Sequence, residues 1–332
     1  MNNPKSENRT AIVYTAAAIL LAVTVLLSLL LGSAKLSVTE VLSALAGNAS
    51  AEATVIVRNI RLPRTAAAVI AGAGLSIAGL LLQAVTNNDL ASPNIIGINS
   101  GAGFAVILML ALFPRAAAVL PFAAFIGAFG AAMLIVYTAS RMGVSKSTVI
   151  LAGVALTAIL NAGISFISFA DTDTMALYSH FSVGGLGGVT FDKLVLPAVM
   201  VALALAVTFV LADRITLLCL GDSLAASLGV RVKLLRTICL VCASLCAASV
   251  VSFAGLLGFV GLVVPHTARV FSGENIKSGL VLSALFGAVL VSAADMFGRI
   301  LLAPAEIPVG IVMAFIGAPF FVYLLLRRNR RA

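Results

Sequence analysis

The sequence contains no tryptophan, only two histidines and four cysteines, and its charged residues make up just 10% of the chain. A soluble domain carries about 25% charged residues, so this chain has too few to cover a surface that faces water. The two histidines, His180 and His266, lie far apart, and neither has a neighbour at the spacing of a zinc motif. These shortages argue against a soluble globular domain and a histidine-based zinc site, and we expect no metal or cofactor.

Acidic residues are scarce as well, with 12 against 21 lysines and arginines. Asp295 is the only acid near the inside of a hydrophobic run, and acids at membrane depth are functional candidates by default. Arg299 follows four residues later and would share a helix face with it, so an internal ion pair is the competing interpretation. Because no convincing nucleophile and base accompany them, we expect no enzymatic activity.

Hydrophobic residues are abundant, at 61% of the chain, and they fall into long runs without charges. Most runs reach the roughly 20 residues that span a bilayer as a helix. They cover 10–34, 65–88, 90–114, 116–140, 147–170, 194–212, 237–268 and 307–326, with a slightly short run at 278–294. The run 237–268 is too long for one span and is interrupted by Gly255, Gly258, Gly261 and Pro265, so it predicts two helices, the second short. The pattern predicts an all-α, polytopic membrane protein with about ten transmembrane helices in a single domain, 1–332, whose core covers 61–326.

The distribution of lysine and arginine predicts the orientation. The first run, about 11–32, is too long and too poorly ended for a signal peptide, so we expect a retained helix. With the N-terminus inside and ten spans, 14 of the 21 basic residues fall on the cytoplasmic side, as the positive-inside rule prefers. This predicts a protein of the cell membrane with both termini cytoplasmic. The net charge of +9 then mostly reflects basic residues in cytoplasmic loops and termini. These residues form no continuous basic patch that would bind nucleic acid.

Some of the basic residues expected on the external side lie at the ends of predicted helices. They are Arg58, Arg61, Arg64 and Arg299. One interpretation is that their side chains reach the membrane interface, which is common for long cationic residues. The other is a docking site for acidic groups on an external partner.

Two short segments superficially resemble nucleotide-binding motifs. "GINSGAGF" (97–104) has Val106 where the last glycine of a dinucleotide fingerprint belongs, and no strand precedes it. "GVSKST" (143–148) lacks the glycine directly before the lysine of a phosphate loop, so it predicts a polar turn. We therefore expect no nucleotide site in the chain itself.

Cys239, Cys242 and Cys246 share one helix face at spacings of three and four, with Cys219 nearby in sequence. A metal site would need polar support and usually more ligands. Buried cysteine acting as a small hydrophobe is the favoured interpretation.

Polar residues also interrupt the hydrophobic pattern between 83 and 103. Irregular backbone at membrane depth is tolerated where it is buried or lines a water-filled cavity, so we assign these residues to a translocation pathway. An ordinary cytoplasmic turn is the alternative, and it explains about half of them. The assigned pathway residues are Gln83, Asn87, Asn88, Pro93 and Asn94, together with Ser145 and Ser147 of the polar turn.

The cytoplasmic segment 220–236 predicts a short surface helix. Asp222 and Ser223 suit its N-terminal cap, and Gly229 suits a stop. Its small apolar face, Ala225 and Leu228, is expected to be exposed unless a soluble partner covers it. A second internal element is the segment 261–275.

Five stretches together resemble the iron-chelate and vitamin B12 permease family of bacterial ABC importers, the FecCD/BtuC-like permeases. They are "RLPR" (61–64), "AGLLLQAVTNNDLASPNIIGINSGAG" (78–103), "LGDSLAASLGV" (220–230), "GLLGFVGLVVPHTAR" (255–269) and "DMFGRILLAPAEIPVGIVMAFIGAPFF" (295–321), in family order. The departures are small: "NDLA" stands at 88–91 for the usual "NPLA", and "EIPVG" at 306–310 for "ELPVG".

The resemblance implies a type II ABC importer permease of ten helices that pairs with a second copy or a related permease. It implies two cytoplasmic ATPases and an extracytoplasmic substrate-binding protein that docks on Arg61, Arg64 and Arg299. It also implies coupling to the ATPase through Gly221, Asp222, Ala225, Leu228, Gly229, Pro265, His266 and Arg269. The expected substrate is an iron-siderophore complex. Haem or cobalamin is the alternative within the family, and an ion-coupled secondary transporter is the alternative from another class.

Overall fold

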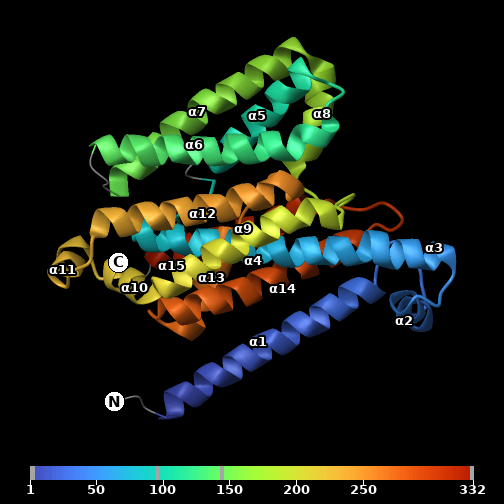
Figure 1. Ribbon diagram of the computed structural model, residues 1–332, viewed down its shortest axis with the longest axis horizontal. Coiled ribbons are helices and arrows are strands. Elements are labelled where there is room, and N and C mark those ends of the chain that lie inside the picture. The colour runs from blue at the N-terminus through green and yellow to red at the C-terminus, as the bar shows by residue number, and fades with distance from the viewer. Residues whose placement is uncertain (1–3, 95–96, 143–145, 330–332) are drawn as a thin grey trace.

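The computed structural model describes residues 4–94, 97–142 and 146–329, and helices are the only regular elements in these ranges (Figure 1). The α-helices are α1 (Pro4–Leu30), α2 (Val38–Ala46), α3 (Ala51–Thr54), α4 (Leu62–Thr86), α5 (Ile98–Leu112), α6 (Leu120–Met142), α7 (Lys146–Ala170), α8 (Thr172–Val183), α9 (Phe191–Val210), α10 (Ala212–Cys219), α11 (Asp222–Ser227), α12 (Val232–Ala254), α13 (Val260–Ser272), α14 (Ile276–Ile300) and α15 (Val309–Asn329). A π-helix (Val55–Arg61) joins α3 to α4, and a 3-10 turn (Ala117–Val119) precedes α6. The predicted all-α class is confirmed.

Ten of these helices correspond in order to the ten predicted spans. Seven of the described segments are long and apolar enough to cross a membrane, and they include α1, α4, α6, α7, α9, α12 and α14. The apolar helices α5 and α15 are shorter, and α13 has 13 residues. The predicted division of the run 237–268 is confirmed, because α12 ends at Ala254 and α13 begins at Val260. Gly255 adopts a φ of 68° at that break, a left-handed conformation that glycine takes without steric cost.

The helix α4 is the centre of the bundle. In the most apolar stretch of the segment Ala51–Thr86, which contains α4, 78% of the residues are buried, against 22% in α1 and 6% in α7. Helices α12, α13 and α14 pack around α4, while α5, α6, α7 and α8 form a group beyond α12 (Figure 1). Close approach depends on glycine, because a β-carbon at Gly79 would collide with the carbonyl oxygen of Gly261 in α13.

The main apolar core includes the cysteine face predicted from the sequence. Cys239, Cys242 and Cys246 are buried on α12 within that core. Within the described ranges, His, Cys, Asp and Glu side chains do not gather into groups of three that would hold a metal ion.

Figure 1 gives the bundle two ends, which we name by the small helices found there. At the α3 end, α1 finishes and α4 begins. At the α11 end lie the start of α1 and the short helices α10 and α11. The candidate site residues divide between these two ends.

Candidate functional site

At the α3 end, two arginines hold the C-terminus of α1. Arg61 donates from Nη1 to the carbonyl oxygens of Leu29 (2.8 Å) and Leu30 (2.9 Å). Arg299 donates from Nη2 to the carbonyl oxygen of Ser28 at 3.0 Å. The last carbonyls of a helix have no partner within the helix, so these guanidinium groups satisfy them and fix α1 to the π-helix and to α14.

Arg64 forms the centre of a buried charge cluster. Its Nη2 lies 2.9 Å from Oδ1 of Asp295, and its Nη1 lies 2.5 Å from Oε2 of Glu306. Arg299 lies 3.1 Å from the other oxygen of Asp295, so the ion pair expected at this spacing is confirmed. Asp295 is only 1% exposed and is neutralised by two arginines from two helices.

Glu306 is the accessible member of the cluster, since its side chain is 34% exposed. Ser33 donates to its Oε1 at 2.8 Å, and Arg64 binds its Oε2. Partial burial alone would raise the pKa of Glu306, but the hydrogen bonds from Arg64 and Ser33 lower it by more, so the pKa lies below the usual glutamate value. Glu306 is therefore charged at neutral pH.

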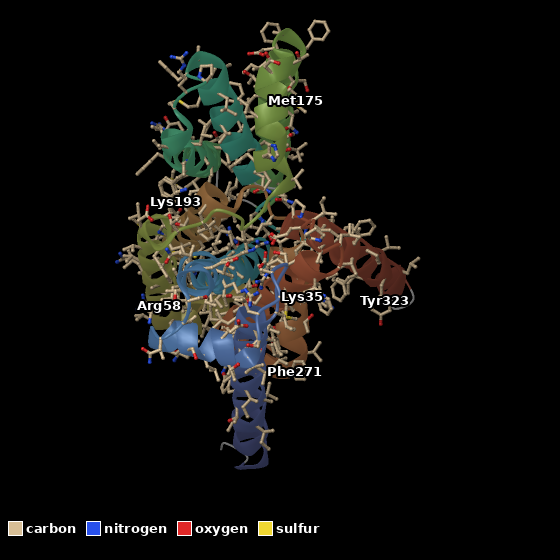
Figure 2. All side chains as sticks on the ribbon, turned by 90° about the vertical axis from the view of Figure 1, so that its right-hand side faces the viewer. Lys35, Arg58, Met175, Lys193, Phe271 and Tyr323 are labelled. Atoms are coloured by element: carbon tan, nitrogen blue, oxygen red, sulfur yellow. The ribbon has the colours of Figure 1, made fainter. Side chains whose placement is uncertain are left out.

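Direct contact of these arginines with an external partner would require exposed side chains. Arg61, Arg64 and Arg299 are instead 3%, 6% and 2% exposed. Their donors are engaged inside the chain, because each arginine bonds groups of another helix or loop. The cations exposed at this end are others, and Figure 2 shows Lys35, Arg58 and Lys193 around it.

At the α11 end, the predicted coupling helix is shorter than expected, and its buried and exposed sides differ from the prediction. Ala225 was expected to be exposed but is 0% exposed, because it packs into the main apolar core. Leu228 is exposed as predicted, at 56%, and two further leucines accompany it: Leu220 at 60% and Leu224 at 47%. Leu224 and Leu228 are four residues apart and share one side of α11, while Leu220 is the C-cap of α10, just before the break at Gly221. We name these three exposed leucines the leucine patch.

The ends of α11 are also only partly as predicted. Gly229 has a φ of 81°, which confirms the left-handed stop, and the amides of Gly229 and Val230 bond back to Ala226 and Ala225. The capping role of Asp222 and Ser223 is wrong, because Gly221 stands at the N-cap and no side chain caps the helix. Asp222 instead accepts a 2.7 Å bond from Arg236 of α12, which holds α11 against the bundle.

The second predicted coupling element lies in α13. Pro265 is buried, and the ring of His266 meets that of Phe320 in α15 edge to face, with 6.0 Å between centroids. Arg269 forms an ion pair with Asp89 of the loop after α4. The distant segments 83–89 and 265–269 are thus joined at the α11 end.

Two predicted pathway residues and one coupling residue line a common cavity. The cavity has a volume of about 60 Å³, and Gln83, Asn87, Arg269 and Cys219 are among its lining residues. Gln83 is buried and donates to the carbonyl oxygen of Gly261 at 3.4 Å, while its Oε1 has no hydrogen-bond partner among the described residues. Since Cys219 ends α10, the cavity lies between the predicted pathway and the segment that leads into α11.

The other predicted pathway residues do not join this cavity. Asn88 accepts a bond from the amide of Leu90, which is the ordinary turn that was the alternative interpretation. Pro93 is buried beside Gly261, and Asn94 accepts a bond from Asn99. Ser145 lies outside the described residues, and so does the side chain of Ser147.

Comparison with known proteins identifies the family. The model of the FecCD transport family matches residues 20–327. The Fe(3+)-citrate import system permease protein YfmE of Bacillus subtilis is 38% identical over 83% of each chain. The iron(3+)-hydroxamate import system permease protein FhuG of the same species is 35% identical over 97% of this chain and 98% of its own. A solved metal-chelate type ABC transporter in an inward-facing conformation is 29% identical, with a TM-score of 0.86, and the match covers 96% of this chain and 99% of that one. The chain belongs to the FecCD transport family.

Proposed function

We propose that this chain is the permease subunit of an ABC importer that moves a ferric chelate of the siderophore class into the cytoplasm. The observation that carries the proposal is the family match over 20–327, together with relatives named for ferric citrate and ferric hydroxamate import. Haem or cobalamin would require the same fold, so the choice of substrate rests on those relatives. An ion-coupled transporter fits less well, because the buried acid Asp295 is already neutralised by Arg64 and Arg299.

ATP hydrolysis belongs, in this proposal, to a separate ATPase that seats on the leucine patch of Leu220, Leu224 and Leu228. Leucines exposed at the end of a bundle are costly in water and favourable in an apolar groove. The salt bridge from Arg236 to Asp222 and the burial of Ala225 tie α11 rigidly to α12. A push on α11 would therefore be transmitted to a core helix and not be absorbed by a loop.

The extracytoplasmic binding protein would dock at the α3 end. The exposed cations there, Lys35, Arg58 and Lys193, suit the steering of acidic groups. Arg61, Arg64 and Arg299 would act mainly by holding the ends of α1, α4 and α14 in register. A carboxylate of the partner would reach Arg64 only by replacing Glu306.

The proposal places both termini and α11 in the cytoplasm and pairs the chain with a second copy or a related permease. The distribution of lysine and arginine supports this orientation. The occurrence of FhuG and FhuB as two permease proteins of hydroxamate import in one species supports pairing with a related chain.

Co-purification tests the proposal. The full chain is expressed together with the ATPase and permease genes that neighbour it and purified through a tag on this chain. The proposal predicts that an ATPase is retained, and that Leu224→Glu loses it while Ala226→Glu, at an exposed alanine about 200° around the helix from Leu224, keeps it. Retention of no ATPase by the unmodified chain would contradict the proposal.

A further inference from the structure

The helix α2 is a self-contained element between α1 and the π-helix. A complete capping box closes its N-terminus: Ser37 accepts from the amide of Glu40, and Glu40 accepts from the amide of Ser37 at 2.7 Å. Gly47, with a φ of 88°, stops its C-terminus in the left-handed conformation. Both ends are thus fixed in the sequence, so α2 is a defined nine-residue helix.

The protein covers only part of the apolar side of α2. Val41 (1% exposed) and Ala44 (0%) pack against Val57 of the π-helix. A second set of apolar residues, spaced by four and three, is exposed. This set is Val38 (56%), Leu42 (59%) and Leu45 (36%), and we name it the α2 apolar face.

Polar residues occupy the opposite side of the helix. At about 100° per residue, Thr39, Ser43 and Glu40 fall on one arc, and the apolar residues fill the rest. The polar arc faces away from the apolar side. A helix of this pattern suits a boundary where protein, hydrocarbon and water meet.

The position of α2 places it at such a boundary. Its buried residues pack with Leu30, the last residue of the spanning helix α1. In Figure 1, α2 is seen nearly end-on beside the end of α1, so it runs across the direction of the spanning helices. An element at the end of a span that runs across it follows the plane of the membrane surface.

Exposed apolar residues also lie at the end of α1, next to α2. Leu26, Leu27 and Leu31 near the end of α1 are exposed by 59%, 39% and 43%. The exposed cations Lys35 and Arg58 flank α2, and Arg58 donates to the carbonyl oxygen of Leu45, the last turn of the helix.

We propose that α2 is a membrane-surface anchor whose apolar face, Val38, Leu42 and Leu45, inserts into the lipid leaflet at the α3 end. A helix of this type sits about 5–10 Å into the boundary between headgroups and acyl chains. It fixes the depth of the π-helix, which carries Arg58 and Arg61. The inference rests on the chain spanning a membrane and not on the substrate or partners proposed above.

The absence of tryptophan makes the test direct, because one introduced indole is the only one in the chain. The full chain is reconstituted into liposomes as Leu42→Trp and, as the matched control, Thr39→Trp on the polar arc. Fluorescence quenching by phospholipids brominated near the glycerol end of the acyl chain is compared with quenching by aqueous acrylamide. Both positions are exposed, so neither variant disturbs the core; Val38→Trp replaces Leu42→Trp if that chain fails to fold.

The proposal predicts blue-shifted emission from Leu42→Trp and lipid quenching several-fold stronger than from Thr39→Trp, with the order reversed for acrylamide. Equal acrylamide quenching at the two positions would show that water covers the apolar face and would overturn the proposal. Protection of Leu42→Trp from both quenchers would show that a second copy of this chain covers the apolar face. That result would also overturn the proposal.

Discussion

Replacing Asp295 with asparagine should be one of the most destabilising isosteric changes in the chain. The carboxylate is 1% exposed and faces two guanidinium groups, that of Arg64 at 2.9 Å and that of Arg299 at 3.1 Å. Asparagine keeps the shape but removes the charge, so the buried Arg299 would lose its carboxylate partner and Arg64 would keep only Glu306. Removing one partner of a buried pair costs about 3–5 kcal/mol of the free energy of unfolding.

Glu306→Gln is the matched control, because it also removes a carboxylate bound by Arg64. The Glu306 side chain is 34% exposed, so water screens the loss, and the expected cost is about 1 kcal/mol or less. Steric trapping in bicelles measures the free energy of unfolding for the native chain and both variants. If Asp295→Asn costs no more than Glu306→Gln, the cluster is not a buried electrostatic centre and the reasoning fails.

Three further outcomes follow from named contacts. Gly79→Ala should lower the thermal unfolding temperature in detergent, because its methyl group meets the backbone of α13, whereas Gly130→Ala, with open space around it, should be neutral or raise it. Leu224→Glu should abolish stimulation of uptake by the ATPase without lowering that temperature, and Ala226→Glu on the other side of the helix should leave both unchanged; a lowered unfolding temperature in Leu224→Glu would show a packing role instead. Since the pKa of Glu306 lies below its usual value, its stabilising contribution should be complete above the ordinary glutamate pKa and be lost as the pH falls through the lowered one. The stability difference between the native chain and Glu306→Gln, followed against pH, measures this, and a difference that is constant with pH would contradict it.

The sequence predicts the helices well because their cause is local. Uncharged runs of about 20 residues form helices in a bilayer, because no water is present there to hydrogen-bond the backbone N–H and C=O groups. The break before α13 follows for the same reason, because Gly255 and Gly258 mark the point where the run 237–268 loses helical geometry. The left-handed stop at Gly229 is equally local.

The features that the sequence leaves open depend on residues far apart. Nothing near Arg64 indicates that its partner is Asp295, 231 positions away, so a buried ion pair resembled a free external cation. The burial of Ala225 was missed because alanine suits either side of a short helix, and only the packing of α11 on α12 decides which. The exposed Leu224 was detectable from its spacing of four residues with Leu228, whereas Leu220 lies before the break at Gly221, where helical spacing no longer applies.

The central claim, that this chain forms the membrane path for a ferric chelate, is tested most directly by uptake. Cells that carry the binding protein and ATPase of the system are compared with and without this chain, using radiolabelled iron bound to citrate, to a hydroxamate siderophore, or to haem. The account predicts energy-dependent uptake of at least one non-haem ferric chelate that is lost with the chain and restored by it, but not by its Leu224→Glu variant. Undiminished uptake of every ferric chelate without the chain, or a loss restricted to haem, would contradict the account.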